Sequence, residues 1–320
     1  MKPKVYITRN IPEKGVENLK SLYDVKVWPD ELAVPRDILK EELRDCQGVI
    51  TMLSDKIDSQ VIDSAPNLKV ISNYAVGYDN IDIKYAASKG IKIGNTPGVL
   101  TETTADLAFT LLMAVSRRIT QAAEYVKLGN WKTWGPQLML GYDVWGATIG
   151  IIGFGRIGQA MARRALGFGM KVLYYSRTRK LKAEKEMNVV YSSLEQIYQQ
   201  SDFISLHTDL NPSTKGLIGK DSFQAMKSNC ILINTARGQV INTADLIEAL
   251  KTHKIAGAGL DVTDPEPINM DSELLRMENC IVVPHIASAS YSTRTRMSVM
   301  AAENIIAGIC GKKLPYCVDV

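Results

Sequence analysis

Three side chains that could do chemistry together follow apolar runs in the second half of the chain. Arg237 stands in ILINTARGQVI, Glu266 lies between two prolines in GLDVTDPEP, and His285 directly follows CIVVP. The apolar runs are typical of buried strands, and the carboxyl ends of parallel strands meet at one edge of a sheet, where such sheets bind ligands. We therefore expect the three side chains at one such edge.

An arginine, a carboxylate and an imidazole are the groups that reduction of a 2-oxo acid would use. An imidazole can deliver a proton near neutral pH, and a carboxylate beside it favours its charged form. A guanidinium can bind the substrate carboxylate through two hydrogen bonds and polarise the neighbouring carbonyl. The hydride would come from a nicotinamide cofactor.

The chain has only three histidines, and a lone histidine is more often structural than catalytic. His207 ends the apolar run DFISLH and either contacts a cofactor or caps its strand. His253, in ALKTHKIAG, is expected at an exposed helix end without a function. His285 is the candidate acid, because an arginine and a glutamate occur at matching strand ends.

A glycine-rich turn after the apolar run ATIGII indicates a dinucleotide site. Gly153, Gly155 and Gly158 fit the pattern G-x-G-x-x-G between a predicted strand and a predicted helix. The first glycine permits the tight turn, the second lets the backbone approach a pyrophosphate, and the third allows close packing of helix on strand. Free amides at the helix start favour phosphate.

The segment after the next predicted strand carries no acid. NAD-binding proteins often place an acidic residue there to bind the ribose hydroxyls, whereas this chain has Ser176, Arg177 and Thr178. Arginine pairs well with phosphate, so the sequence favours NADP (NADPH), with NAD (NADH) as the alternative. In the other interpretation, Arg177 stacks on adenine and Arg179 is a solvated surface residue.

Short apolar runs alternate with helical patterns on both sides of one long helical pattern at 101–131, and this alternation predicts two α/β units with parallel sheets. The strands are expected at 5–8, 25–28, 48–52, 68–73 and 91–95, and then at about 147–152, 170–175, 202–206, 230–234, 256–260 and 280–283. The last helix lies beyond the final strand of the second array, so we expect it to return to the first unit.

Composition narrows the class of protein. The 320 residues are 46% hydrophobic and 22% charged, with a dispersed net charge of +4 that does not favour nucleic acid. The five cysteines are scattered without a Cys-x-x-Cys pair, so we expect free thiols and neither zinc nor disulfides. There is no signal-peptide pattern and no apolar run of membrane length, so we expect a soluble cytoplasmic protein.

The order of these motifs resembles the D-isomer-specific 2-hydroxyacid dehydrogenases, within them most closely the glyoxylate/hydroxypyruvate reductases. The likeness covers nearly the whole chain, including NYAVGYDNIDI and NTPGVLTETTADLAF. It implies a flavodoxin-like substrate domain at 1–98 plus 288–320, a dinucleotide-binding Rossmann-like domain at 99–287, and an active site in the cleft between them. It also implies a homodimer that acts on a small 2-oxo or 2-hydroxy acid.

The resemblance also implies roles for individual residues. Arg237 would orient substrate, Glu266 would support the histidine, and His285 would be the acid/base. Substrate would be bound by Leu53, Val76, Gly77, Arg237 and Ser288, with Trp134 either reaching the partner subunit's site or packing in the core. Cofactor contacts would come from Thr104, Gly153, Gly155, Arg156, Ile157, Gly158, Ser176, Arg177, Thr178, His207, Thr235, Ala236, Asp261, His285 and Ala287.

Some positions depart from the family or from its relatives. Asp209, in LHTDLNPST, stands where the family commonly has proline, in the loop expected near the cofactor. Val76 replaces the lysine of phosphite-oxidising relatives, and Glu266 replaces the glutamine of formate dehydrogenases, so a 2-oxo acid is favoured. A broader 2-oxo acid reductase remains an alternative, as does a dinucleotide-sensing protein resembling the family's corepressors, which would bind cofactor without turnover.

Overall fold

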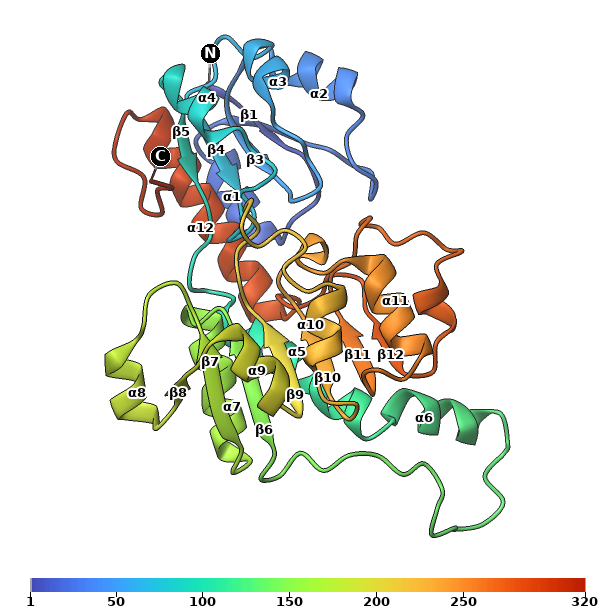
Figure 1. Ribbon diagram of the computed structural model, residues 1–320. Coiled ribbons are helices and arrows are strands. Elements are labelled where there is room, and N and C mark those ends of the chain that lie inside the picture. The colour runs from blue at the N-terminus through green and yellow to red at the C-terminus, as the bar shows by residue number, and fades with distance from the viewer. Residues whose placement is uncertain (1, 320) are drawn as a thin grey trace. The chain divides into compact units, whose positions relative to one another are not determined.

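The chain folds into two compact units, each built on one parallel sheet (Figure 1). The structure is a computed structural model that describes residues 2–319. One unit comprises residues 2–100 and 289–319, and the other comprises residues 101–288. Within the described range, no helix is long and apolar enough to cross a membrane, and no group of three or more His, Cys, Asp or Glu side chains could hold a metal ion.

The first unit has five parallel strands in the order β2-β1-β3-β4-β5, which is the flavodoxin-like order. The strands are β1 (Lys4–Ile7), β2 (Asp24–Val27), β3 (Cys46–Thr51), β4 (Val70–Asn73) and β5 (Lys92–Gly94). The helices are α1 (Glu13–Lys20), α2 (Arg36–Leu43), α3 (Ser59–Asp63), α4 (Ile83–Ser88) and α12 (Tyr291–Ile309). Strand β4 is buried along its whole length, as expected where helices cover both faces of a parallel sheet.

The last helix, α12, closes the first unit. It packs against α1, β3 and β4, while a separate apolar cluster joins α2, α3 and α4 to the sheet. The unit is therefore built from two stretches of sequence that are separated by the whole of the second unit.

The second unit has seven parallel strands in the order β12-β11-β10-β9-β6-β7-β8. They are β6 (Thr148–Ile152), β7 (Lys171–Tyr175), β8 (Val190–Tyr191), β9 (Phe203–Leu206), β10 (Ile231–Asn234), β11 (Gly257–Leu260) and β12 (Cys280–Val282). The strand order reverses between β6 and β9, and at such a switch point the carboxyl ends of the strands leave a crevice for a ligand.

Helices cover the second sheet, with apolar clusters that together contain residues of every strand. The helices are α5 (Thr101–Ser116), α6 (Ile119–Lys127), α7 (Arg156–Gly167), α8 (Leu181–Met187), α9 (Leu194–Gln200), α10 (Lys220–Ala225) and α11 (Thr243–Lys251), with 3-10 turns at Gly238–Val240 and Glu273–Arg276. Strands β9, β10 and β11 are buried at every residue.

The structure of this unit differs from the sequence-based expectation at one helix and at one strand. The predicted single helix at 101–131 is two helices, because Arg118 adopts a left-handed backbone with φ of 51° and ends the first one. The chain has also left the helix after Lys127. The two-residue strand β8 was not predicted, since so short a segment has no readable periodicity.

Candidate active site

The imidazole of His285 is hydrogen-bonded to the carboxylate of Glu266. The distance from His285 Nδ1 to Glu266 Oε1 is 2.6 Å. The two side chains are 27% and 40% exposed, so a small molecule can approach them from solvent. Because Nδ1 is bonded to the carboxylate, the imidazole has its Nε2 edge left for another partner.

The backbone at His285 is held in a left-handed turn just after β12. Its φ is 51°, and its amide donates to the main-chain oxygen of Asp261 at 2.9 Å. The carboxylate of Asp261 accepts from the amides of Ile286 and Ala287. Burial raises the pKa of Asp261, and these amides oppose that rise. Asp261 therefore clamps the turn that presents the imidazole.

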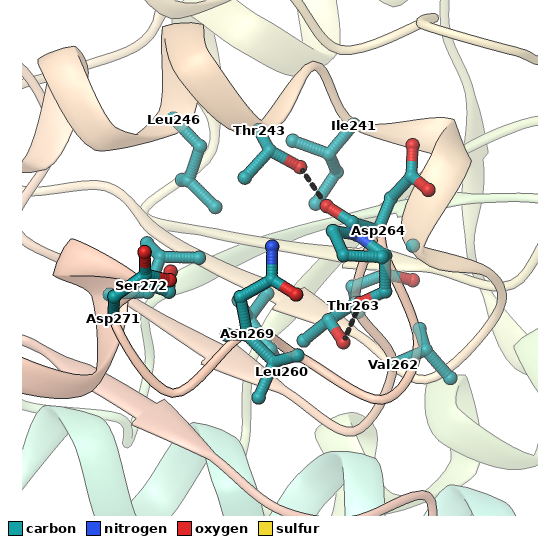
Figure 2. A pocket seen from close by; sticks show the side chains of 15 residues that line it. Ile241, Thr243, Leu246, Leu260, Val262, Thr263, Asp264, Asn269, Asp271 and Ser272 are labelled. Atoms are coloured by element: carbon teal, nitrogen blue, oxygen red, sulfur yellow. Dashed lines mark hydrogen bonds between the residues drawn. The ribbon is translucent and has the colours of Figure 1, made fainter.

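The segment leading to Glu266 is tied down by threonine hydroxyls. Thr243 donates to the main-chain oxygen of Asp264 at 3.1 Å, and Thr263 donates to that of Pro265 at 2.8 Å. Figure 2 shows these contacts beside a cavity of about 180 Å³. None of Arg237, Glu266 and His285 lines this cavity, so it is not the place of the chemistry.

Arg237 follows β10 on a turn that is shaped by Asn234. The Asn234 side chain donates to the main-chain oxygen of Arg237 at 2.8 Å and accepts from the amide of Ala236 at 3.0 Å. A Cβ on Gly238 would collide with the backbone of Thr263. Only glycine lets the turn that carries Arg237 pack against the segment that leads to Glu266.

The glycine turn after β6 has the shape that a dinucleotide needs. Gly153 has φ of 94°, and a Cβ on Gly158 would collide with the carbonyl oxygen of Gly153. At Gly155, no atom lies within 4 Å of the place a Cβ would take. The backbone there faces open space at the start of α7, where a pyrophosphate fits, and Arg156 and Ile157 are the first residues of that helix.

A second observation supports a ligand in this unit. The Oγ1 atom of Thr235, just after β10, is buried and has no hydrogen-bond partner within the described part of the chain. A buried hydroxyl is normally satisfied, so a polar ligand atom would complete it. Thr235 is one of the predicted cofactor contacts.

The segment after β7 is folded back on itself. Ser176 donates to the main-chain oxygen of Thr178 at 2.7 Å, and the side chain of Arg177 is 76% exposed. Arg179 is not simply solvated, because it pairs with Glu184 at 2.8 Å and lies over the ring of Tyr191.

His207 follows β9, directly beside the glycine turn. Its main-chain oxygen is among the atoms that a Cβ on Gly153 would strike, and its Nε2 lies 2.8 Å from the hydroxyl of Ser205. Burial lowers the pKa of His207 to about 3, so the ring is neutral. His207 thus abuts the turn, and its charged form is disfavoured.

In the first unit, a network of asparagines holds the turn that carries Val76 and Gly77. Asn95 donates to the main-chain oxygen of Val76 at 2.8 Å, and Asn73 donates to that of Gly77 at 2.8 Å. Asn80 donates to Asn73 and to the main-chain oxygen of Met52, next to Leu53. Since the carbonyls are engaged by the asparagines, the amides of the turn are the groups left to meet a ligand.

Three more predicted residues, Thr104, Trp134 and Ser288, lie in the second unit. Thr104 is buried in α5 and Ser288 is buried after the His285 turn, whereas Trp134 is 77% exposed and so is not a core residue. The sequence analysis did not assign roles to Asn73, Asn80, Asn95 and Asn234. For Asn73, Asn95 and Asn234 the signal was an asparagine within or beside an apolar strand, where a polar side chain needs a partner. Asn80 lies in the loop between β4 and α4 and gave no such signal.

The fold, the glycine turn and the histidine–glutamate pair define a dehydrogenase of 2-hydroxy acids. Residues 109–287 match the D-isomer specific 2-hydroxyacid dehydrogenase, NAD binding domain. The chain belongs to this family and is an NAD(P)-dependent oxidoreductase.

Similar proteins share its whole length. The chain is 49% identical to a glyoxylate reductase of Korarchaeum cryptofilum over 320 residues, which cover 100% of this chain and 96% of that protein. It is 50% identical to a glyoxylate reductase of Thermococcus kodakarensis, covering 100% and 97%. A Sinorhizobium meliloti NADPH-dependent glyoxylate/hydroxypyruvate reductase, solved with NADP and malonate, superposes with a TM-score of 0.89 at 31% identity, covering 99% and 97%.

Proposed function

We propose that this protein reduces glyoxylate and hydroxypyruvate to glycolate and D-glycerate, with NADPH favoured over NADH. The observation that carries the proposal is the 2.6 Å hydrogen bond between His285 and Glu266 at the strand ends of the dinucleotide-binding unit. Full-length relatives named glyoxylate reductases support the choice of substrate.

In this proposal, His285 is the proton donor. Glu266 fixes the ring through Nδ1 and stabilises the imidazolium, so Nε2 gives its proton to the carbonyl oxygen of the substrate. When bound, a reduced nicotinamide would supply the hydride for the carbonyl carbon. The oxygen gains a proton while the carbon gains a hydride, which yields the 2-hydroxy acid.

Two groups are proposed to bind the substrate. Arg237 pairs with its carboxylate and polarises the carbonyl, and the amides of Val76 and Gly77 also bind the carboxylate. Their orientation follows from Asn73 and Asn95, which engage the carbonyls of the same turn. Leu53 and Ser288 are the other proposed substrate contacts.

The proposed cofactor contacts belong to the second unit. Gly153 to Gly158 hold the pyrophosphate, and Thr104, Thr235, Ala236, Asp261 and Ala287 line the nicotinamide half. Ser176, Arg177 and Thr178 hold the adenosine end, where Arg177 pairs with the 2′-phosphate. The supporting facts are the open space at Gly155 and the unpartnered hydroxyl of Thr235.

We also propose that two copies of the chain associate. Helix α6 buries none of its residues, and with the segment that follows it to β6 it extends away from the rest of its unit (Figure 1). This arm, residues 119–145, exposes the large apolar side chains Ile119, Val126, Leu128, Trp131, Trp134, Leu138, Leu140, Tyr142 and Trp145. So large an apolar surface is typical of a protein interface.

The test is steady-state reduction of glyoxylate and hydroxypyruvate, each with NADPH and NADH, on one preparation. We expect turnover of both acids and a higher kcat/KM with NADPH. Turnover of only larger 2-oxo acids would replace the proposed substrate. A preference for NADH would overturn the role of Arg177.

A further inference from the structure

Arg177 faces a carboxylate that the family pattern does not lead one to expect. Its guanidinium lies 3.6 Å from Oδ1 of Asp209, and the two side chains are 76% and 63% exposed. Arg177 follows β7 and Asp209 follows β9, and these strands flank β6, which leads into the glycine turn. The ion pair therefore bridges the two sides of the turn where the adenosine end of a dinucleotide is expected.

The loop that carries Asp209 holds its carboxylate in place. Asn211 donates to Oδ2 of Asp209 at 3.0 Å, which leaves Oδ1 for Arg177. Thr214 donates to the main-chain oxygen of Asp209 at 2.7 Å, and Asn211 in turn accepts from Ser213. The carboxylate is thus oriented by its own loop and does not depend on Arg177 for its position.

We propose that Asp209 is a cofactor-selectivity residue that competes with the 2′-phosphate of NADP(H) for Arg177. The inference rests on the proposed role of Arg177 in the function above. A bound 2′-phosphate must displace the carboxylate from the guanidinium and then lie near its negative charge. NADH carries no such phosphate, so Asp209 lowers the affinity for NADPH alone. The affinities for NADPH and NADH therefore become more similar.

The experiment measures the dissociation constants of NADPH and NADH by fluorescence titration, without substrate, for the wild type and Asp209→Asn. The asparagine keeps the shape of the loop and removes the charge. We expect the affinity for NADPH to rise about 3- to 10-fold, the scale of a single charge interaction at a partly exposed site, while the affinity for NADH changes less than about twofold.

A matched control is Glu186→Gln, which removes one charge from α8, where Glu186 pairs with Lys182 at 3.7 Å. It should leave both constants unchanged. The gain in Asp209→Asn should also shrink at high salt, because exposed charges are screened over about 10 Å at 0.1 M.

Arg177→Ala separates the two hypotheses. If this variant binds NADPH as tightly as the wild type, the proposal that Arg177 binds the 2′-phosphate is wrong. If it loses NADPH selectively but Asp209→Asn gains nothing, or gains equally for NADH, the proposal for Asp209 alone is overturned. Competition by adenosine 2′,5′-bisphosphate, compared with 5′-ADP, gives the same comparison without nicotinamide.

Discussion

His285 combines a proposed chemical role with an unusual backbone, and a test must separate the two. Its φ of 51° suits asparagine better than most residues. We expect His285→Asn to keep the fold and the dissociation constant for NADPH while kcat falls about 10²- to 10⁴-fold, the usual contribution of a general acid. Stopped-flow and steady-state assays measure this loss. His253→Asn is the control, because exposed His253 has φ of 52°, and wild-type turnover by the His285 variant would remove His285 from the chemistry.

Glu266 should act on the rate of the reaction more than on cofactor binding. Glu266→Gln keeps a hydrogen-bond acceptor for Nδ1 of His285 but removes the anion that stabilises the imidazolium. The proposed proton donor is then less well supported, so kcat for glyoxylate should fall about tenfold or more. The readout is kcat for glyoxylate, with the dissociation constant for NADPH as the control. An unchanged kcat contradicts the role of Glu266.

Because of His207, we expect the free energy of unfolding to fall as the pH becomes acidic. Its pKa is lowered to about 3 by burial, whereas an unfolded chain protonates histidine near pH 6.5. The unfolded state therefore binds more protons between these values, so this contribution to stability is present above about pH 6.5 and is lost as the pH falls toward 3. Urea unfolding of His207→Asn should show a weaker fall in stability from pH 7 to 4 than the wild type. Equal slopes would show that His207 does not titrate on unfolding.

At the level of single residues, the sequence predicted the polar side chains that follow strands. It did not predict the asparagines that orient the turns of the site. Arg237, Glu266 and His285 stand next to apolar runs, so their strand-end positions were readable. The pairing of Asn95 with Val76 and of Asn80 with Met52 depends on chain segments brought together by folding. No local pattern encodes which carbonyl an asparagine will meet.

The proposed function of the glycine turn before α7 depends on the lack of a side chain at Gly155. We expect Gly155→Ala to place a methyl group in the open space proposed for the pyrophosphate, and so to weaken NADPH binding at least about tenfold with little loss of stability. Calorimetric titration and thermal melting measure the two effects. Gly167→Ala is a matched control, because this glycine of α7 also has no neighbour within 4 Å of an added Cβ. If both variants bind NADPH equally well, the turn does not hold the cofactor.

Elements with strong periodicity were predictable and irregular ones were not. All strands except β8 were expected within one or two residues of their observed places, because buried parallel strands are continuous apolar runs. The break after α5 was missed because an arginine in the sequence does not indicate a left-handed backbone, which non-glycine residues rarely adopt. The amino acids on either side of the break all suit a helix.

The apolar arm at 119–145 makes a prediction for the whole molecule. Sedimentation should give a mass of two 35.3 kDa chains. If Trp134 reaches the partner's substrate, Trp134→Ala should raise KM for glyoxylate several-fold while the dimer persists. Trp145→Ala is the comparison within the arm, since Trp145 is 81% exposed and should not change KM. A monomeric wild type would overturn the association, and equal KM values would leave Trp134 a purely structural part of the interface.

The return of α12 to the first unit has a consequence for how the chain is made. Domains generally fold as they leave the ribosome, the first-synthesised one first. Here the unit that starts the chain cannot complete its core until α12, at Tyr291–Ile309, has been translated. The second unit is contiguous and ends at residue 288. During synthesis, the dinucleotide-binding unit is therefore complete while the first unit still lacks its closing helix. The unit whose synthesis begins first is thus the last to have all of its residues.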